Sequence, residues 1–400
     1  MDLIASVIQN YDSFLEGHIS DRFFKHSELL KLLERVSSNE KFGLRQAGLS
    51  AKGLSINLVK FGTGHCRVFL WSQMHGNEAT ATMALADLFN FLSLNDSFNE
   101  LRSTISQNCT LYILPMVNPD GAEVFTRRNA MEIDINRDFN KQQSPEGKLL
   151  RSLLDEIQPH FGFNLHDQST LWSAGNTGNP ATISLLAPAY DEDLSINHVR
   201  QKAMQIIVAI NSYLQKTIPR HVGRFDDEYE PRAFGDNFQA AGTSTILIES
   251  GGLVNDPEKQ YTRKLVFSAI LVGLLSISEQ SYLQEKQEDY FLIPENKKSH
   301  FHILLRNCKL EINGIPYTTD IGLNADERIN DNFHSVTYTY LVHEVGDLSG
   351  YFGYKELDCG SFKLILTKKL KYEDPADLIL QDGLTTLLSI ENGRVTIENL

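Results

Sequence analysis

The sequence predicts an α/β protein with a mixed, largely parallel sheet and helices on both faces, followed by a small β-rich domain. Up to about Gln280, apolar strand patterns alternate with amphipathic helix patterns, which is typical of a sheet covered by helices. Beyond Glu285 there is no convincing long helix, and short β-type runs are separated by turn signals. We therefore expect two domains, residues 1–284 and 285–400. A chain of 400 residues also exceeds what one ordinary core holds.

The first domain opens with a helical segment of about 40 residues, in which apolar residues recur on one face. The strand patterns that follow occupy residues 56–59, 67–71, 110–114, 161–165, 184–187 and 245–248. Helix patterns occupy residues 77–92, 147–157 and 196–214. The apolar run at 266–277 is too short and too interrupted by serine for a membrane span, so it predicts a buried helix.

The second domain is predicted from β-type runs and the turns between them. The runs lie at residues 301–305, 336–342, 362–366 and 385–390. The turn signals are Asn313-Gly314, Asp382-Gly383 and Asn392-Gly393.

Composition limits the class of protein and its partners. A hydrophobic content of 42% and a charged content of 22% are those of a globular protein. The formal net charge of −14 argues against nucleic acid or an anionic membrane as a partner. Residues 1–16 lack the basic and apolar regions of a signal peptide, and the four cysteines show no metal or redox spacing. We therefore expect a cytoplasmic protein; its oligomeric state stays open.

Three of the apolar strands run into side chains that can bind or serve a metal ion. His75 and Glu78 follow the strand at 67–71, and His166 and Glu249 directly follow two later strands. In open α/β sheets the ligand site lies beyond the carboxyl ends of the strands, so these four side chains should meet. Two histidines and one carboxylate form a ligand set of catalytic zinc, and a further glutamate fits the base that a zinc-activated water needs. The sequence therefore predicts a zinc hydrolase.

The spacing of the first two residues supports the metal site. His75 and Glu78 are three positions apart, beside the start of a predicted helix. Residues at i and i+3 share one face of a helical turn, so both side chains can reach one ion.

Further motifs between residues 60 and 252 resemble those of the zinc carboxypeptidase family, peptidase family M14, in order and spacing. The matching elements are His75-Gly76-Asn77-Glu78, Asn118-Pro119-Asp120-Gly121, Asp134-Ile135-Asn136-Arg137-Asp138-Phe139, His166 and Glu249. Five ordered matches are a strong signal, whereas any one alone would be weak. The resemblance implies a carboxypeptidase-like fold and one Zn²⁺ held by His75, Glu78 and His166.

The resemblance also implies catalytic roles. Glu249 would take a proton from the zinc-bound water and pass it to the leaving amine. Arg127 would face the developing oxyanion, although the adjacent Arg128 could do so instead.

The same resemblance implies how substrate is bound. Asn136 and Arg137 would bind a free carboxylate of the substrate, because a guanidinium matches carboxylate geometry. Asp134 and Asp138 would hold this segment or orient the ligands. Tyr229 has about the offset of the family's mobile tyrosine before the catalytic glutamate.

The implied activity is that of a metallocarboxypeptidase that removes the C-terminal residue of peptides. An alternative is an amidohydrolase of the related aspartoacylase and succinylglutamate desuccinylase branch, which acts on small acyl amino acids. The Asn118-Pro119-Asp120-Gly121 element favours the peptidase branch. A third possibility is a binding module that lost catalysis, and the intact Glu78, His166, Arg137 and Glu249 argue against it.

Overall fold

The computed structural model describes residues 2–399, which form two compact units. The first unit comprises Met1–Thr170 and Ala181–Asn296, and the second comprises Leu171–Pro180 and Lys297–Leu400. The first unit extends beyond the expected boundary at residue 285 because Tyr290 is fully buried in its core. Residues 171–180 belong to the second unit because their strand β6 (Trp172–Ala174) pairs with β10 (Asn296–Lys298). No local pattern signals that long-range pairing.

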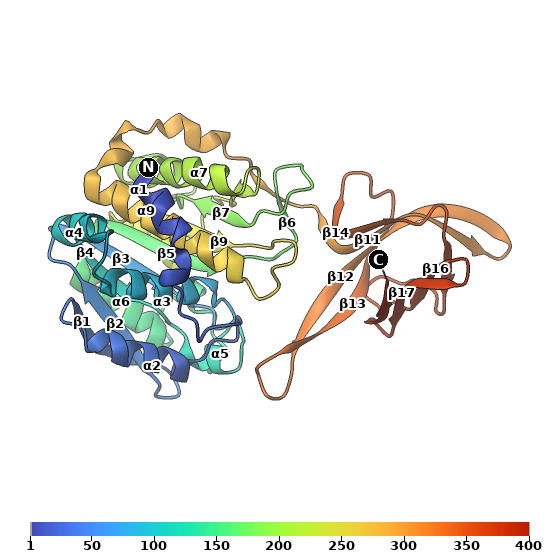
Figure 1. Cartoon of the computed structure of the whole chain (residues 1–400), viewed down its shortest axis with the longest axis horizontal. Coiled ribbons are helices and arrows are strands. Elements are labelled where there is room, and N and C mark those ends of the chain that lie inside the picture. The colour runs from blue at the N-terminus through green and yellow to red at the C-terminus, as the bar shows by residue number, and fades with distance from the viewer. Residues whose placement is uncertain (1, 400) are drawn as a thin grey trace. The chain divides into compact units, whose positions relative to one another are not determined.

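The first unit is built on an eight-stranded mixed sheet with the order β1-β2-β4-β3-β5-β9-β7-β8 (Figure 1). Its strands are β1 (Phe42–Leu49), β2 (Ser55–Phe61), β3 (Cys66–Ser72), β4 (Cys109–Leu114), β5 (Phe161–Asp167), β7 (Ile183–Leu186), β8 (Val222–Arg224) and β9 (Ser244–Ser250). The four central strands β4, β3, β5 and β9 are parallel. The expected mixed, largely parallel sheet is therefore confirmed.

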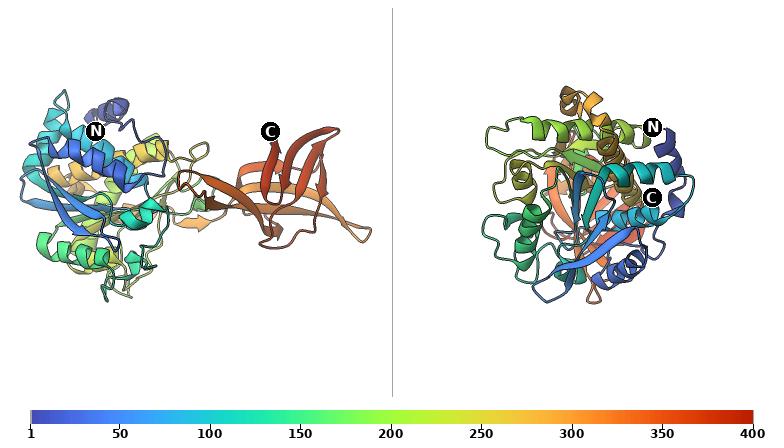
Figure 2. Two further views of the ribbon diagram at one scale, coloured as in Figure 1. Left: turned by 90° about the horizontal axis from the view of Figure 1, so that it is seen from below. Right: turned by 90° about the vertical axis from the view of Figure 1, so that its left-hand side faces the viewer.

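Helices cover both faces of this sheet (Figures 1 and 2). They are α1 (Asp2–Gln9), α2 (His26–Ser37), α3 (Thr80–Ser93), α4 (Asn99–Asn108), α5 (Pro119–Glu123), α6 (Pro145–Ile157), α7 (His198–Thr217), α8 (Phe234–Ala240) and α9 (Gln260–Glu279). Val68 and Leu70 of β3 pack into one core with α3, α7 and α9. Phe69 and Trp71 pack into a second core with α6 and α8. Alternate residues of the strand therefore serve opposite faces, as the pleat requires.

Within the described part of the first unit there are also 3-10 helices: η1 (Tyr11–Ser13), η2 (Ile135–Arg137), η3 (Ser281–Gln284) and η4 (Gln287–Leu292). By length and composition alone, α9 is a candidate membrane span, but 89% of its apolar window is buried inside the protein. This agrees with the buried helix expected at residues 266–277.

Several elements of the first unit were absent from the sequence prediction, among them α5, α8, β8, β1 and α4. Strand β1 lies at the edge of the sheet, and most of its side chains are partly or fully exposed, so its apolar pattern is weak. Helix α4 is polar on average and buries only Leu101, Arg102 and Ile105.

The second unit contains two four-stranded sheets, which confirms the expected β-rich C-terminal region. One has the order β13-β12-β11-β14 and the other β15-β16-β17-β18. The strands are β11 (His300–Ile312), β12 (Ile315–Ile329), β13 (Val336–Gly346), β14 (Phe352–Asp358), β15 (Lys363–Leu366), β16 (Leu378–Asp382), β17 (Thr385–Glu391) and β18 (Arg394–Glu398). Buried residues from both sheets form one core.

Two of the turns predicted from the sequence close hairpins of the second unit, whereas the turn at residues 330–335 between β12 and β13 was not predicted. Asn313-Gly314 joins β11 to β12, and both residues have positive φ. Asn392-Gly393 joins β17 to β18 in the same way. Positive φ at both central positions gives the backbone the twist that a tight hairpin needs.

Candidate metal centre and active site

His75, Glu78 and His166 form a buried cluster whose ligand atoms all lie within 4.8 Å of one another. Nδ1 of His75 lies 2.7 Å from one oxygen of the Glu78 carboxylate, and Nδ1 of His166 lies 2.8 Å from the other. All three residues are at most 6% exposed. The structure therefore brings together the three residues that the sequence predicts as metal ligands.

His75 and Glu78 lie in a turn before helix α3 and not on the helix, which corrects the expected helical arrangement. The amide of Glu78 donates to the carbonyl of His75 at 3.1 Å, so the turn itself brings positions i and i+3 together. The turn packs directly on α5, where a Cβ at residue 76 would lie 2.0 Å from the carbonyl carbon of Gly121. Gly76 is therefore required for this close approach.

The Asn118-Pro119-Asp120-Gly121 element builds α5, the support beneath this turn. The Asn118 side chain accepts a hydrogen bond from the amide of Gly121 and caps the helix. The Asp120 carboxylate accepts from the hydroxyl of Ser50 and the amide of Lys52, which ties α5 to the β1–β2 hairpin.

His166 and Glu249 lie side by side on the neighbouring parallel strands β5 and β9, where they form a register pair. Glu249 is 8% exposed, and one of its carboxylate oxygens is buried without a hydrogen-bond partner among the described residues. Burial, then the nearby Glu78 and Asp167 carboxylates, raise the pKa of Glu249 well above its usual value. A carboxylate with these surroundings is suited to accept a proton.

The cluster fits a bound divalent cation. Nε2 of His75 lies 3.0 Å from Asp134, which fixes the proton of a neutral imidazole on that side. The lone pair of Nδ1 then faces a negatively charged oxygen of Glu78, and these two groups repel each other. A divalent cation bound to both would remove this repulsion. Burial raises the pKa of Glu78, but the two histidine rings outweigh burial and hold the pKa far below its usual range. Two imidazoles and one carboxylate are ligands that Zn²⁺ accepts.

Asp134 and Arg127 extend the cluster. One oxygen of Asp134 contacts His75, and the other accepts from Nε and Nη2 of Arg127 at 3.1 and 3.0 Å. Nη1 of Arg127 reaches Glu78 at 3.2 Å. Arg128 instead donates to the carbonyl of Glu132, so Arg127 is the arginine beside the cluster.

Asn136 and Arg137 lie on η2, which begins directly after Asp134. The Asn136 side chain accepts from the amide of Phe234 at 3.0 Å. Nε of Arg137 lies 3.1 Å from the Glu230 carboxylate, and the Arg137 side chain is 38% exposed. The two predicted carboxylate binders are therefore adjacent, and one of them already holds a carboxylate of the protein.

Asp138 holds this segment and does not touch the ligands. Its carboxylate accepts from the amides of Gln143 and Ser144 and from the Ser144 hydroxyl. These bonds secure the start of α6, where Ser144 is the N-cap. Of the two aspartates named from the sequence, only Asp134 orients a ligand.

Tyr229 is partly buried among acidic side chains, and within residues 2–399 it makes no hydrogen bond or ion pair with the cluster. Burial, then the nearby Asp236, Glu192 and Asp191, raise the pKa of its hydroxyl. The structure therefore does not bring Tyr229 together with the other predicted site residues.

Three residues missed by the sequence prediction lie directly behind the cluster. The Asp167 carboxylate accepts from the Thr80 hydroxyl at 2.5 Å, and the amide of Asp167 donates to Glu78. Lys259 is 5% exposed, and its ammonium donates to the carbonyls of Ser250 and Gly251 at the end of β9. The only sign of Asp167 in the sequence is that it directly follows His166. Nothing in the sequence around Lys259 signals its burial.

Comparisons with known proteins agree with this geometry. Residues 30–174 match the family model described as zinc carboxypeptidase, Peptidase M14. Carboxypeptidase SOL1 of Arabidopsis thaliana is 32% identical over 103 residues, which are 23% of this chain and 21% of that protein. Probable carboxypeptidase 2 of Arthroderma benhamiae is 28% identical over 114 residues, 28% of this chain and 20% of that protein. The chain thus spans about a fifth of the length of these relatives.

Solved structures show the same fold. The metallo-carboxypeptidase from Burkholderia cenocepacia superposes with a TM-score of 0.52 at 14% identity, covering 65% of this chain and 70% of that one. The matched family region contains His75, Glu78 and His166. Residues 30–174 thus match the zinc carboxypeptidase family model, and the first unit shares its fold with a solved metallo-carboxypeptidase.

Proposed function

We propose that the first unit is a zinc-dependent metallocarboxypeptidase that removes the C-terminal residue of peptides. The observation that carries this proposal is the convergence of His75, Glu78 and His166 within 4.8 Å, with Glu249 beside His166 on the adjacent strand. Metal ligands and a buried base lie together at the carboxyl ends of parallel strands, where α/β folds place their ligand sites.

In this proposal, His75, Glu78 and His166 would hold the zinc ion. Zinc, when bound, supplies a Lewis acid that polarises a carbonyl and lowers the pKa of water. Asp134 keeps the His75 ring in the tautomer that turns Nδ1 toward Glu78. Glu249 takes a proton from the attacking water and delivers it to the leaving amine.

Arg127 stabilises the developing oxyanion. Its guanidinium is held by Asp134 and Glu78, so its charge is already oriented beside the cluster. Preorganised charge of this kind is usually the largest contribution to catalysis. Arg127→Ala should therefore lower kcat by about 10²-fold or more. Arg128→Ala is the matched control, because Arg128 binds a backbone carbonyl instead.

Asn136 and Arg137 bind the terminal carboxylate of the substrate. Arg137 offers two parallel N–H donors, which match a carboxylate in geometry and charge. Its contact with Glu230 supports this role, since it demonstrates that a carboxylate fits against the guanidinium at 3.1 Å.

A substrate panel tests the proposal. Zinc-loaded full-length protein is incubated with tetrapeptides that have a free or an amidated C-terminus and with N-acyl amino acids, and products are identified by mass spectrometry. We expect trimming of the free peptides and at least ~10²-fold slower trimming of the amidated ones. Cleavage of N-acyl amino acids without trimming of peptides would instead identify an amidohydrolase. Zinc binding without any turnover would favour a binding module.

A further inference from the structure

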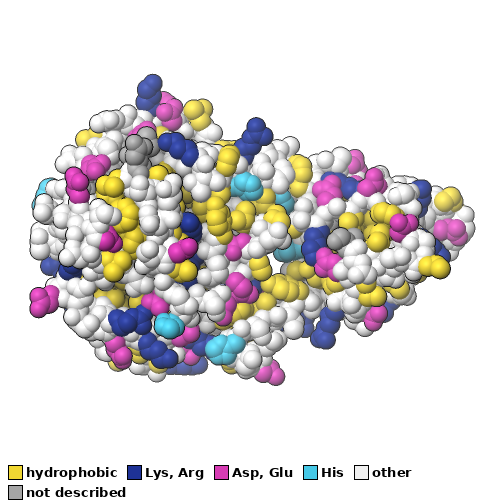
Figure 3. Space-filling view, in the orientation of Figure 1, with side chains coloured by type: hydrophobic (Ala, Val, Ile, Leu, Met, Phe, Trp, Pro, Cys, Tyr) yellow, Lys and Arg dark blue, Asp and Glu magenta, His cyan; other side chains and the backbone are white. Residues whose placement is uncertain are grey.

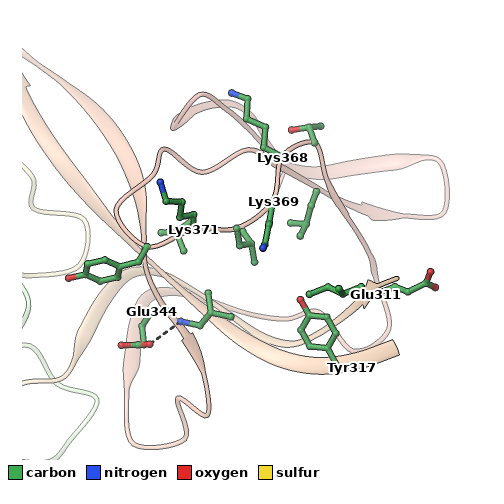
Figure 4. Close-up of a pocket in the computed structure, with 13 residues that line it drawn as sticks. Glu311, Tyr317, Glu344, Lys368, Lys369 and Lys371 are labelled. Atoms are coloured by element: carbon green, nitrogen blue, oxygen red, sulfur yellow. Dashed lines mark hydrogen bonds between the residues drawn. The ribbon is translucent and has the colours of Figure 1, made fainter. Parts of the chain in front are cut away.

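A cavity of about 570 Å³ lies entirely within the second unit. Its walls come from the end of β11, the start of β12, strand β13 and the segment 366–372 that follows β15 (Figure 4). This volume falls within the roughly 300–1,000 Å³ that is typical of ligand pockets. None of the residues proposed for catalysis lies in this unit.

The cavity gathers apolar side chains that are exposed to solvent. Among the described residues of the second unit, eight large hydrophobic ones are exposed, and four of them line this cavity: Ile312, Tyr317, Val345 and Tyr372. Beneath them lies Val342, which is 2% exposed and part of the core. Single exposed hydrophobic residues are normal on a protein surface, but a contiguous group beside a cavity marks a binding site.

Positive charge borders the same apolar surface, although the whole chain carries a net charge of −14. Lys368, Lys369 and Lys371 lie on one wall. Lys368 is engaged by Asp377 at 2.8 Å, and Lys371 lies 3.8 Å from Asp374. Within residues 2–399, Lys369 makes no ion pair, and Figure 4 shows its amine directed toward the same space as the hydroxyl of Tyr317.

We propose that this cavity binds a peptide segment in which a bulky apolar side chain stands between acidic residues. The apolar side chain packs on Tyr317 and Val345, and a neighbouring carboxylate pairs with Lys369. A desolvated apolar anchor within a charged rim is the usual anatomy of a protein interface.

Two features favour a peptide over a lipid surface. The apolar residues line a concave surface, whereas insertion into a bilayer requires a protruding one. On the face of the molecule in Figure 3, acidic and basic side chains are interspersed, without the broad basic surface that an anionic membrane attracts.

Fluorescence anisotropy of labelled peptides tests the proposal on the full-length protein. The probe is fluorescein-Gly-Glu-Phe-Glu-Gly-amide, whose amidated end prevents trimming from consuming it. The comparison peptides replace Phe by Ser or both Glu residues by Lys. We expect saturable binding of the first probe only. Lys369→Glu should raise its Kd by about 5- to 20-fold, because an attraction becomes a repulsion.

Two further variants separate this site from a general charge effect. Lys298→Glu changes an exposed lysine of the same unit that does not line the cavity, and it should leave Kd unchanged. Tyr317→Thr removes the ring but keeps a residue suited to a strand, and it should weaken binding with an unchanged circular dichroism spectrum. Absence of saturable binding would overturn the proposal. Equal Kd in the Lys369 and Lys298 variants, or binding of phosphatidylserine vesicles in preference to the peptide, would also overturn it.

Discussion

The carboxylate of Glu230 lies 3.1 Å from Nε of Arg137, so the guanidinium assigned to the substrate carboxylate already has an anionic partner. The same carboxylate accepts from Nε and Nη2 of Arg232 at 2.8 and 2.6 Å. Hydrogen bonds from Arg232, aided by the charge of Arg137, hold the pKa of Glu230 at about 2. Glu230 is therefore ionised at neutral pH, and under the proposed function it would compete with a peptide terminus for Arg137.

Removing that competitor should improve substrate binding. Glu230→Gln should lower KM for free-ended peptides by about 2- to 5-fold with little change in kcat, because a partly exposed ion pair is worth at most about 1 kcal/mol. Steady-state kinetics on one tetrapeptide measure both constants. Glu228→Gln, an exposed neighbour, is the control. A higher KM in the Glu230 variant would indicate that Glu230 positions Arg137 and does not compete for it.

Mutation should distinguish the proposed base, Glu249, from the proposed metal ligand His166. Glu249→Gln should retain about one zinc per chain but lose about 10²–10⁴-fold in kcat, because the amide cannot accept the proton. His166→Ala should lose the metal, since it removes one of three protein ligands. Elemental analysis and kinetics on the purified variants measure these outcomes. Loss of zinc in the Glu249 variant would reassign that residue as a ligand.

Substitutions of Asp134 and Asp138 should have different effects on zinc binding and stability, although both residues belong to the same motif. Asp134→Asn should weaken zinc binding by about 10- to 100-fold, because the carboxylate that orients His75 is lost. Asp138→Asn should leave zinc affinity unchanged and lower the free energy of unfolding by about 1 kcal/mol, because Asp138 secures the start of α6. Competition with a chromophoric chelator measures the first quantity, and urea unfolding measures the second. Equal zinc affinity in both variants would remove the orienting role from Asp134.

Asp236 should make stability depend on pH. Burial raises its pKa to about 6 in the folded protein, whereas an unfolded Asp titrates near about 3.9. The folded state therefore binds the proton more tightly. The resulting stabilisation is complete below the unfolded pKa and is lost as pH rises through about 6, by about 3 kcal/mol in total. Asp236→Asn should remove this part of the pH dependence.

Urea unfolding at pH 4 and pH 7 measures this difference. The fluorescence of Trp71, which is fully buried in the first unit, reports the transition in a Trp172→Phe background. An identical pH dependence in the parent protein and in the Asp236→Asn variant would contradict the prediction.

The sequence by itself determined the elements that form the site. Hydrophobic periodicity and turn residues are local properties, so the sequence alone predicts the strands that end at His75, His166 and Glu249. Their alternation with helices predicts parallel strands whose carboxyl ends lie together. The same reasoning located the buried helix α9 and two hairpin turns of the second unit.

Only the tertiary structure decided which side chains meet across long stretches of chain. The contact of Glu230 with Arg137 joins residues more than ninety positions apart, as does the pairing of the segment 171–180 with β10. The choice of Arg127 over Arg128, and the placement of His75 and Glu78 in a turn against Gly121, likewise depend on packing. Such contacts follow from how the layers pack. The local pattern of apolar and polar residues does not specify which residues far apart in the sequence will be in contact.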